Sequence, residues 1–85
     1  MVTDKDRMEN LAANLRRLME LRPPEGMTQK QLEAASGVPQ ETISRCLNAK
    51  SDPAVSVVAR LADALDTSID RLLSAPPREK VLQAS

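Results

Sequence analysis

The stretch PQETISRCLN, residues 39–48, carries four polar side chains whose chemistry suits the edges of DNA base pairs. If the stretch is a helix, a turn of about 100° per residue places Gln40, Glu41, Ser44 and Arg45 on one face, opposite Ile43. Arginine matches guanine, glutamine matches adenine, and serine can bond several base atoms. Solvated helix faces usually carry lysine and glutamate, so this composition favours a face that binds base pairs.

Glu41 lies four residues before Arg45, the spacing of an ion pair along a helix. We expect this pair to form. The alternative is that Glu41 accepts a hydrogen bond from a cytosine amino group. In either case the carboxylate penalises DNA of the wrong sequence, because phosphates repel an uncompensated negative charge.

A second short helix is predicted immediately before this stretch. Thr28 and Gln31 have the spacing of a capping box, and Gly37 suits the left-handed residue that ends a helix, which predicts a helix over residues 28–36. Pro39 fits the first turn of the next helix. Two short helices joined by a glycine turn form the helix-turn-helix arrangement of DNA-binding proteins.

Three further helices are expected around this pair. Apolar residues at helical spacing predict a helix over residues 6–22, capped by Thr3 and Asp6. Asp52 as N-cap, with Pro53 at the first helical position, predicts a helix over residues 53–65. Ser68 caps a short last helix over residues 69–73. The sequence therefore predicts an all-α fold of five helices in one domain of 85 residues.

The composition excludes several classes of function. With no histidine and one cysteine, the chain cannot build a histidine metal site, a Ser-His-Asp triad or an internal disulfide. We expect no enzyme, no metal and no cofactor. No secretory signal or membrane-spanning run is present, so a cytoplasmic protein is the default. Cys46 falls on the apolar face and is predicted to be a buried, inert thiol. The formal net charge of zero counts against nucleic-acid binding, although local charge matters more than the average.

The run TQKQLEAASGVPQETISRCLNAK resembles the helix-turn-helix of the lambda-repressor and Cro family. The similarity continues through ARLADALDTSIDRLL and covers about residues 8–74. It implies a compact five-helix, lambda-repressor-like domain that binds double-stranded DNA and regulates transcription. The residues that match the family pattern are Thr28, Gln29, Leu32, Gly37, Val38, Ile43, Ser44 and Lys50.

Site residues follow from the resemblance position by position. It implies base reading by Gln40, Glu41, Ser44 and Arg45. Phosphate contacts are implied for Gln29, Lys30, Asn48 and Lys50, with Arg16 and Arg17 as weaker candidates. The sequence also departs from the family pattern at four places. Glu33 replaces a small alanine and must project sideways or widen the helix crossing; Met19 and Leu47 replace an ion pair; and Ala49 replaces a glycine.

Relatives of this family bind as dimers, with two recognition helices about one DNA turn, roughly 34 Å, apart on a near-palindromic operator. The resemblance thus implies a bacterial or phage-encoded homodimeric repressor, with Ile69, Leu72 and Leu73 at the dimer surface. The DNA-binding domain spans residues 1–75, with the helix-turn-helix over 28–48, and residues 76–85 form a tail or linker. Two alternatives remain open: an antitoxin-type protein that also binds a protein partner, and the N-terminal half of a longer repressor.

Overall fold

The computed structural model describes residues 3–22 and 24–76, and within these ranges the chain folds into five helices and no strand. The helices are α1 (Asp4–Glu20), α2 (Gln29–Ser36), α3 (Gln40–Leu47), α4 (Val55–Ala64) and α5 (Ile69–Leu73). The predicted all-α, five-helix fold is confirmed. Of the predicted tail, residues 76–85, all but Pro76 lie outside the described residues.

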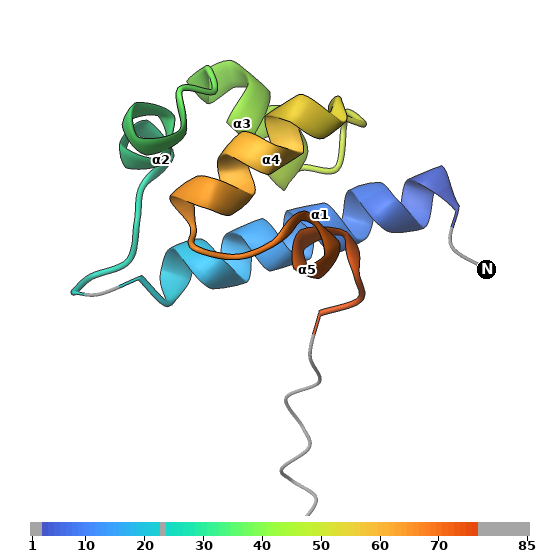
Figure 1. Ribbon diagram of the computed structural model, residues 1–85, viewed down its shortest axis with the longest axis horizontal. Coiled ribbons are helices and arrows are strands. Elements are labelled where there is room, and N and C mark those ends of the chain that lie inside the picture. Colours follow the sequence, from blue (N-terminus) through green and yellow to red (C-terminus); the bar gives the residue numbers. More distant parts are fainter. Residues whose placement is uncertain (1–2, 23, 77–85) are drawn as a thin grey trace, which may run out of the picture.

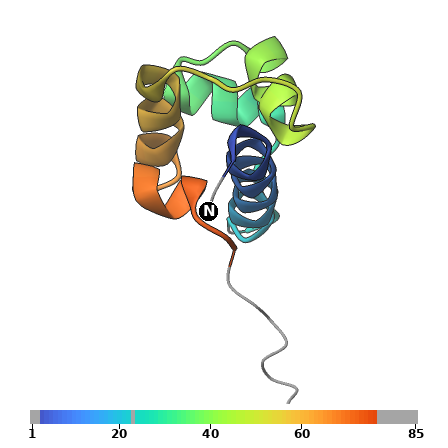
Figure 2. The ribbon, with the colours of Figure 1, turned by 90° about the vertical axis from the view of Figure 1, so that its right-hand side faces the viewer.

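The helices close into a ring around a single core. Helix α1 packs against α3 and α5, α2 packs against α3 and α4, and α4 packs against α5. Figure 1 shows α1 as the longest element, with α2, α3 and α4 on one side of it and α5 lying across it. Figure 2, turned by 90°, shows α2 and α3 bridging the space between α1 and α4. This arrangement holds α3 at the edge of the molecule, where one of its faces stays open.

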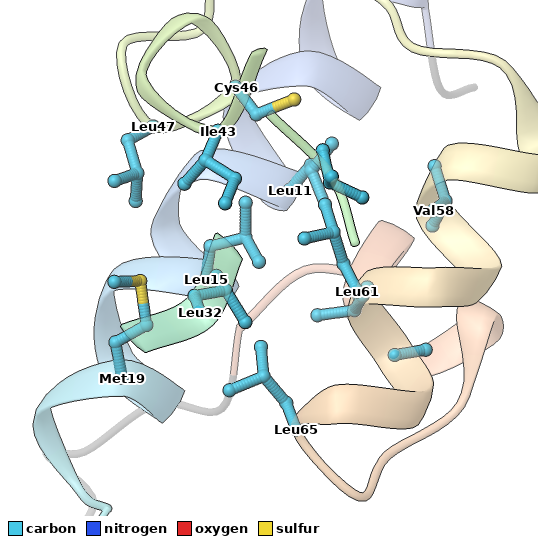
Figure 3. Packing of buried hydrophobic residues seen from close by; sticks show 13 residues of the cluster. Leu11, Leu15, Met19, Leu32, Ile43, Cys46, Leu47, Val58, Leu61 and Leu65 are labelled. Carbon is cyan, nitrogen blue, oxygen red and sulfur yellow. The ribbon is translucent and has the colours of Figure 1, made fainter. Parts of the chain in front are cut away.

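The core consists of aliphatic side chains and sulfur-containing residues, because the chain has no aromatic residue. Leu15, Leu32, Ile43 and Leu61 are completely buried where the helices meet (Figure 3). Leu72 of α5 is also completely buried. The prediction that Leu72 contributes to a dimer surface is therefore wrong, because this side chain is buried in the core of a single chain.

Local capping signals determine where α1 and α2 begin. Both predicted capping boxes form: Thr3 with Asp6 before α1, and Thr28 with Gln31 before α2. Because Thr3 is the N-cap, α1 begins at Asp4, two residues earlier than predicted. Gly37 has φ 77°, the left-handed conformation expected for the residue that ends α2.

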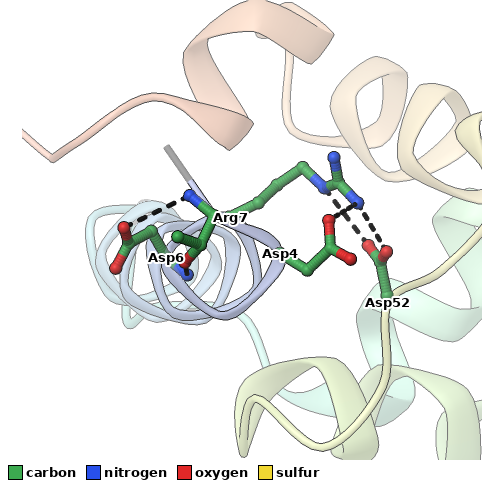
Figure 4. Close-up of polar contacts among 5 residues, drawn as sticks. Asp4, Asp6, Arg7 and Asp52 are labelled. Atoms are coloured by element: carbon green, nitrogen blue, oxygen red, sulfur yellow. Dashed lines mark hydrogen bonds and ion pairs between the residues drawn. The ribbon is translucent and has the colours of Figure 1, made fainter. Parts of the chain in front are cut away.

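The predicted start of α4 is wrong. The helix begins at Val55 with Ala54 at the cap position, and no side chain caps it. Asp52 instead bonds Arg7 of α1, whose Nε lies 3.3 Å from its Oδ1 (Figure 4). Arg7 also reaches Asp4 at 3.1 Å. The hydrogen bond to Asp52 raises the pKa of the Arg7 guanidinium. This long-range bond ties the segment before α4 to α1, so Asp52 is not available as a cap.

Two asparagines of α1 hold the C-terminal end of α5. The buried Asn14 donates from Nδ2 to the carbonyl oxygens of Arg71, Leu72 and Ser74, at 3.0, 2.8 and 2.8 Å. Asn10 donates to the carbonyl oxygen of Leu73 at 3.1 Å. The last carbonyls of a helix have no partner within the helix, so these amides stabilise an element of only five residues. This role of both asparagines was not predicted from the sequence.

Ala49, directly after α3, has φ 54°, a left-handed conformation that costs a residue with a side chain about 1–2 kcal/mol. Ala49→Gly should therefore raise the free energy of unfolding by about 0.5–1 kcal/mol. Glycine removes the backbone strain of the folded state, but its greater freedom in the unfolded chain offsets part of this gain. Urea denaturation measures the change. The matched control is Ala13→Gly, at an exposed position in the middle of α1, where glycine should instead destabilise. A loss of stability in Ala49→Gly would contradict the expectation.

Candidate nucleic-acid interface

Helix α3 separates an apolar face from a polar one. Ile43, Cys46 and Leu47 are buried against the core. Gln40, Glu41 and Arg45 are exposed, and Ser44 is half-buried on the same side. The helix begins at Gln40, so Pro39 lies at the cap position before the first turn rather than inside it. The predicted division of this helix into a core face and an outward face is confirmed.

The outward face of α3 forms one wall of a shallow hollow of about 470 Å³. We call this hollow the reading surface. It brings together all four residues predicted to contact bases and three of those predicted to contact phosphates. The reading surface is lined by Gln29, Gln40, Glu41, Ser44, Arg45, Asn48 and Lys50. Three segments of the chain therefore contribute to one patch: the start of α2, the helix α3, and the turn that follows α3.

Arg45 and Glu41 form an ion pair across one turn of α3, with Nη2 3.1 Å from Oε2. The predicted pair is confirmed. Both side chains are largely exposed, so the pair adds little to stability and can exchange partners readily. Its effect is to hold the guanidinium along the outward face of α3, in a position from which its remaining N–H groups can meet a ligand.

The ends of the helices supply further hydrogen-bond groups beside the reading surface. Gln29 is the first residue of α2, where free backbone amides and the helix dipole favour an anion. Asn48 donates from Nδ2 to the Ser44 carbonyl oxygen at 2.9 Å, which orders the side chain at the end of α3. Lys30 is exposed on α2 but does not line the reading surface.

Arg16 and Arg17, the two α1 arginines predicted as weaker phosphate contacts, have different positions. Arg16 donates from Nη2 to the carbonyl oxygen of Leu47 at 3.1 Å, so its guanidinium supports the last turn of α3. Arg17 instead lines a separate hollow with Asp70 and Arg71 of α5. Arg17, one of the predicted phosphate contacts, therefore does not line the reading surface. Arg16 contacts α3 through its hydrogen bond to the Leu47 carbonyl oxygen, a contact that was not predicted from the sequence.

The departures from the family pattern are accommodated inside the fold. Met19 and Leu47 are both buried members of the core, as expected for an apolar pair that replaces ions. Glu33 is half-buried on α2, and its carboxylate accepts a hydrogen bond from the backbone amide of Gln40, with 3.2 Å between Oε2 and N. This contact between Glu33 and the start of α3 was not predicted from the sequence.

Cys46 is completely buried, as predicted. Burial raises the pKa of its thiol, an effect opposed by the weaker influence of a hydrogen bond with Ser51. A neutral, enclosed thiol is a poor nucleophile. Within the described residues no group of His, Cys, Asp and Glu is arranged to hold a metal ion.

A model of the helix-turn-helix family matches residues 15–72, which is most of the chain and includes α2, α3 and the reading surface. The chain belongs to the Cro/C1-type helix-turn-helix family. This helix-turn-helix protein is a DNA-binding transcriptional regulator. No helix in the described part of the chain is both long and apolar enough to cross a membrane.

The fold of this helix-turn-helix protein is similar to that in a crystal structure of a hypothetical transcription factor from Neisseria. The two share 21% sequence identity and superpose with a TM-score of 0.76, over 100% of this chain and 92% of the other. A search of curated proteins found no match. At this level of identity the likeness concerns the fold.

Proposed function

We propose that this regulator is a repressor that binds a palindromic operator as a homodimer, with α3 of each subunit in the major groove. One observation supports this above all: the four candidate base-reading side chains share one surface hollow with Gln29, Asn48 and Lys50. The side chains suited to bases lie on α3, and those suited to phosphates lie at the start of α2 and directly after α3. This is the distribution that a helix placed in the major groove requires.

Within this proposal the side chains have distinct tasks. Arg45 donates two hydrogen bonds to guanine O6 and N7, whereas Gln40 donates to adenine N7 and accepts from adenine N6. Ser44 contacts the base pair between them. The free amides at the start of α2, beside Gln29, bind a phosphate and fix the depth at which α3 enters the groove. Bound in this way over a promoter, the dimer represses by excluding the polymerase.

The zero net charge bears on affinity as well as on specificity. DNA affinity falls with salt with a slope of about −0.9 per phosphate neutralised, so few phosphate contacts mean a shallow slope and weak non-specific binding. Specificity then depends mainly on base contacts. This is consistent with the reading surface, where Lys50 and Arg45 are the cationic residues and Arg45 is partly neutralised by Glu41.

The test is selection of bound duplexes from a random pool by the full chain. We expect an enriched palindrome with half-sites one helical turn apart and a guanine at the position of Arg45. A footprint over such a site in a promoter, with lower transcription in vitro, would support repression. If no sequence is enriched even at low salt, the proposed specificity is wrong. Enrichment of an isolated half-site would instead contradict the dimer.

The dimer surface that we propose is the outer side of α5, where Ile69 and Leu73 remain partly exposed. Ile69→Glu should weaken dimerisation at least about tenfold, because it buries a charge between subunits. Sedimentation equilibrium without DNA measures the effect, and a melting curve shows that the variant is folded. Leu21→Glu is the control, because Leu21 is an exposed apolar residue at the C-cap of α1 and does not belong to α5. An unchanged dissociation constant in Ile69→Glu would exclude this surface.

A further inference from the structure

The first turn of α3 has no cap from the residue that precedes it. Pro39 occupies the cap position and has no side-chain donor or acceptor. The Gln40 amide, at the first position of the helix, has no hydrogen-bond partner within the helix. The acceptor comes from the neighbouring helix instead: Oε2 of Glu33, on α2, lies 3.2 Å from the Gln40 nitrogen.

Glu33 makes a second hydrogen bond at the other end of the same turn. Its backbone carbonyl oxygen accepts from the Gly37 amide at 2.8 Å, which ends α2. One residue thus holds both ends of the connection, residues 37–39, between the two helices. Ser36 adds a further bond within the turn, since its hydroxyl oxygen accepts from the Val38 amide at 3.1 Å. The bond between the Gln40 amide and the Glu33 carboxylate therefore connects the start of α3 directly to α2.

The charge of Glu33 strengthens this contact. A carboxylate at the N-terminus of a helix interacts favourably with the helix dipole, and a charge-assisted hydrogen bond is stronger than a neutral one. The residue that it fixes, Gln40, lines the reading surface. A small residue at position 33 would leave the Gln40 amide free and allow the start of α3 to move relative to α2.

We infer that Glu33 is a positioning residue for sequence recognition: its carboxylate, by bonding the Gln40 amide, fixes the orientation in which α3 presents its base-contacting side chains. This inference rests on the proposed function. Base contacts require a fixed orientation because hydrogen bonds weaken steeply with misalignment, whereas contacts to phosphates tolerate movement. Glu33 therefore acts on specific binding and leaves non-specific binding nearly unchanged.

The test compares Glu33→Ala, which removes the acceptor, with Glu33→Gln, which retains an acceptor oxygen but not the charge. Dissociation constants are measured for the selected operator and for a scrambled duplex at one salt concentration. Glu33→Ala should weaken operator binding about tenfold and leave binding of the scrambled duplex within about twofold. Glu33→Gln should restore most of the operator affinity. Asp63→Ala, on the exposed side of α4, controls for the loss of one negative charge.

A readout without DNA accompanies these measurements. In the free protein, hydrogen exchange of the Gln40 amide should become faster in Glu33→Ala and stay close to the parent rate in Glu33→Gln. A role in stability alone would lower the melting temperature of Glu33→Ala and leave the ratio of the two DNA affinities unchanged, which would overturn the inference. Equal losses in both variants would also overturn it, because charge rather than the hydrogen bond would then be responsible. If the parent protein selects no DNA sequence, the proposed function itself fails.

Discussion

Arg45→Ala is expected to weaken operator binding by about 1–3 kcal/mol, or roughly 5- to 150-fold, and to relax the choice of base at one position of each half-site. Arg45 is the arginine of α3, it lies on the reading surface, and its guanidinium has N–H groups beyond the one bonded to Glu41. Selection from a random pool should return the same palindrome with that one position degenerate. Binding of a scrambled duplex should change much less, because Arg45 is predicted to contact a base rather than the backbone.

Two further variants sharpen this prediction. Arg45→Lys keeps the charge but not the two-pronged geometry, so it should lose most of the discrimination while preserving the salt dependence. Arg60→Ala removes an exposed arginine of α4 outside the reading surface and is the matched control. If Arg45→Ala binds every single-base variant of the operator as well as the parent protein does, base reading by Arg45 is wrong.

Asn14→Asp should strongly destabilise the fold at neutral pH. The side chain is buried, and its amide donates to three carbonyl oxygens at the end of α5. A carboxylate at this place would lose these donors and add a buried negative charge that faces three carbonyl dipoles. We expect a loss of about 3–5 kcal/mol, against a total of about 5–15 kcal/mol for a typical domain.

The loss should depend on pH in a definite direction. In the folded variant the carboxyl is favoured in its neutral form, which can still donate one hydrogen bond, so its pKa lies above the ordinary value of about 3.9. For an acid with a raised folded-state pKa, the stability contribution is complete below the unfolded-state pKa and is lost as the pH rises through the folded-state value. Asn14→Asp should therefore recover stability relative to the parent protein between pH 7 and pH 4.

Urea denaturation at several pH values, followed by circular dichroism, measures this effect. Asn14→Leu is the control of similar size: it lacks the donors and the charge, so it should lose about 1–3 kcal/mol at every pH. A difference between the two variants that does not shrink at acid pH would contradict the account. Near-parent stability of both variants would mean that the three carbonyl oxygens find other partners.

Features set by neighbours in the sequence were predictable from the residues alone. Two capping boxes, the left-handed Gly37, the two faces of α3 and the bond between Glu41 and Arg45 all depend on residues at most four positions apart. Over such distances helix geometry determines which side chains meet. For the same reason the four candidate base-reading residues could be chosen before the fold was known, since they share one face of one helix.

Features that join distant segments were decided by the tertiary structure. Asp52 had the local character of an N-cap, yet its partner is Arg7, 45 residues away. Leu72 was placed at the dimer surface by the family resemblance, yet it belongs to the core. Arg17 was grouped with the phosphate contacts by sequence but lies against α5. In each case local periodicity predicts on which face of its helix a residue lies. It does not predict which neighbouring element covers that face.

Local sequence patterns predicted the five helices, the caps of α1, α2 and α5, and the polar face of α3. Only the tertiary structure showed that Asn14 holds α5, that Arg16 supports the end of α3 and that Glu33 bonds its beginning. The physical reason is that a helix end has unpaired amides and carbonyls whatever its sequence, and partners can come from anywhere in the chain. Which side chain supplies them depends on how the helices pack, so the orientation of the reading surface is a property of the assembled fold.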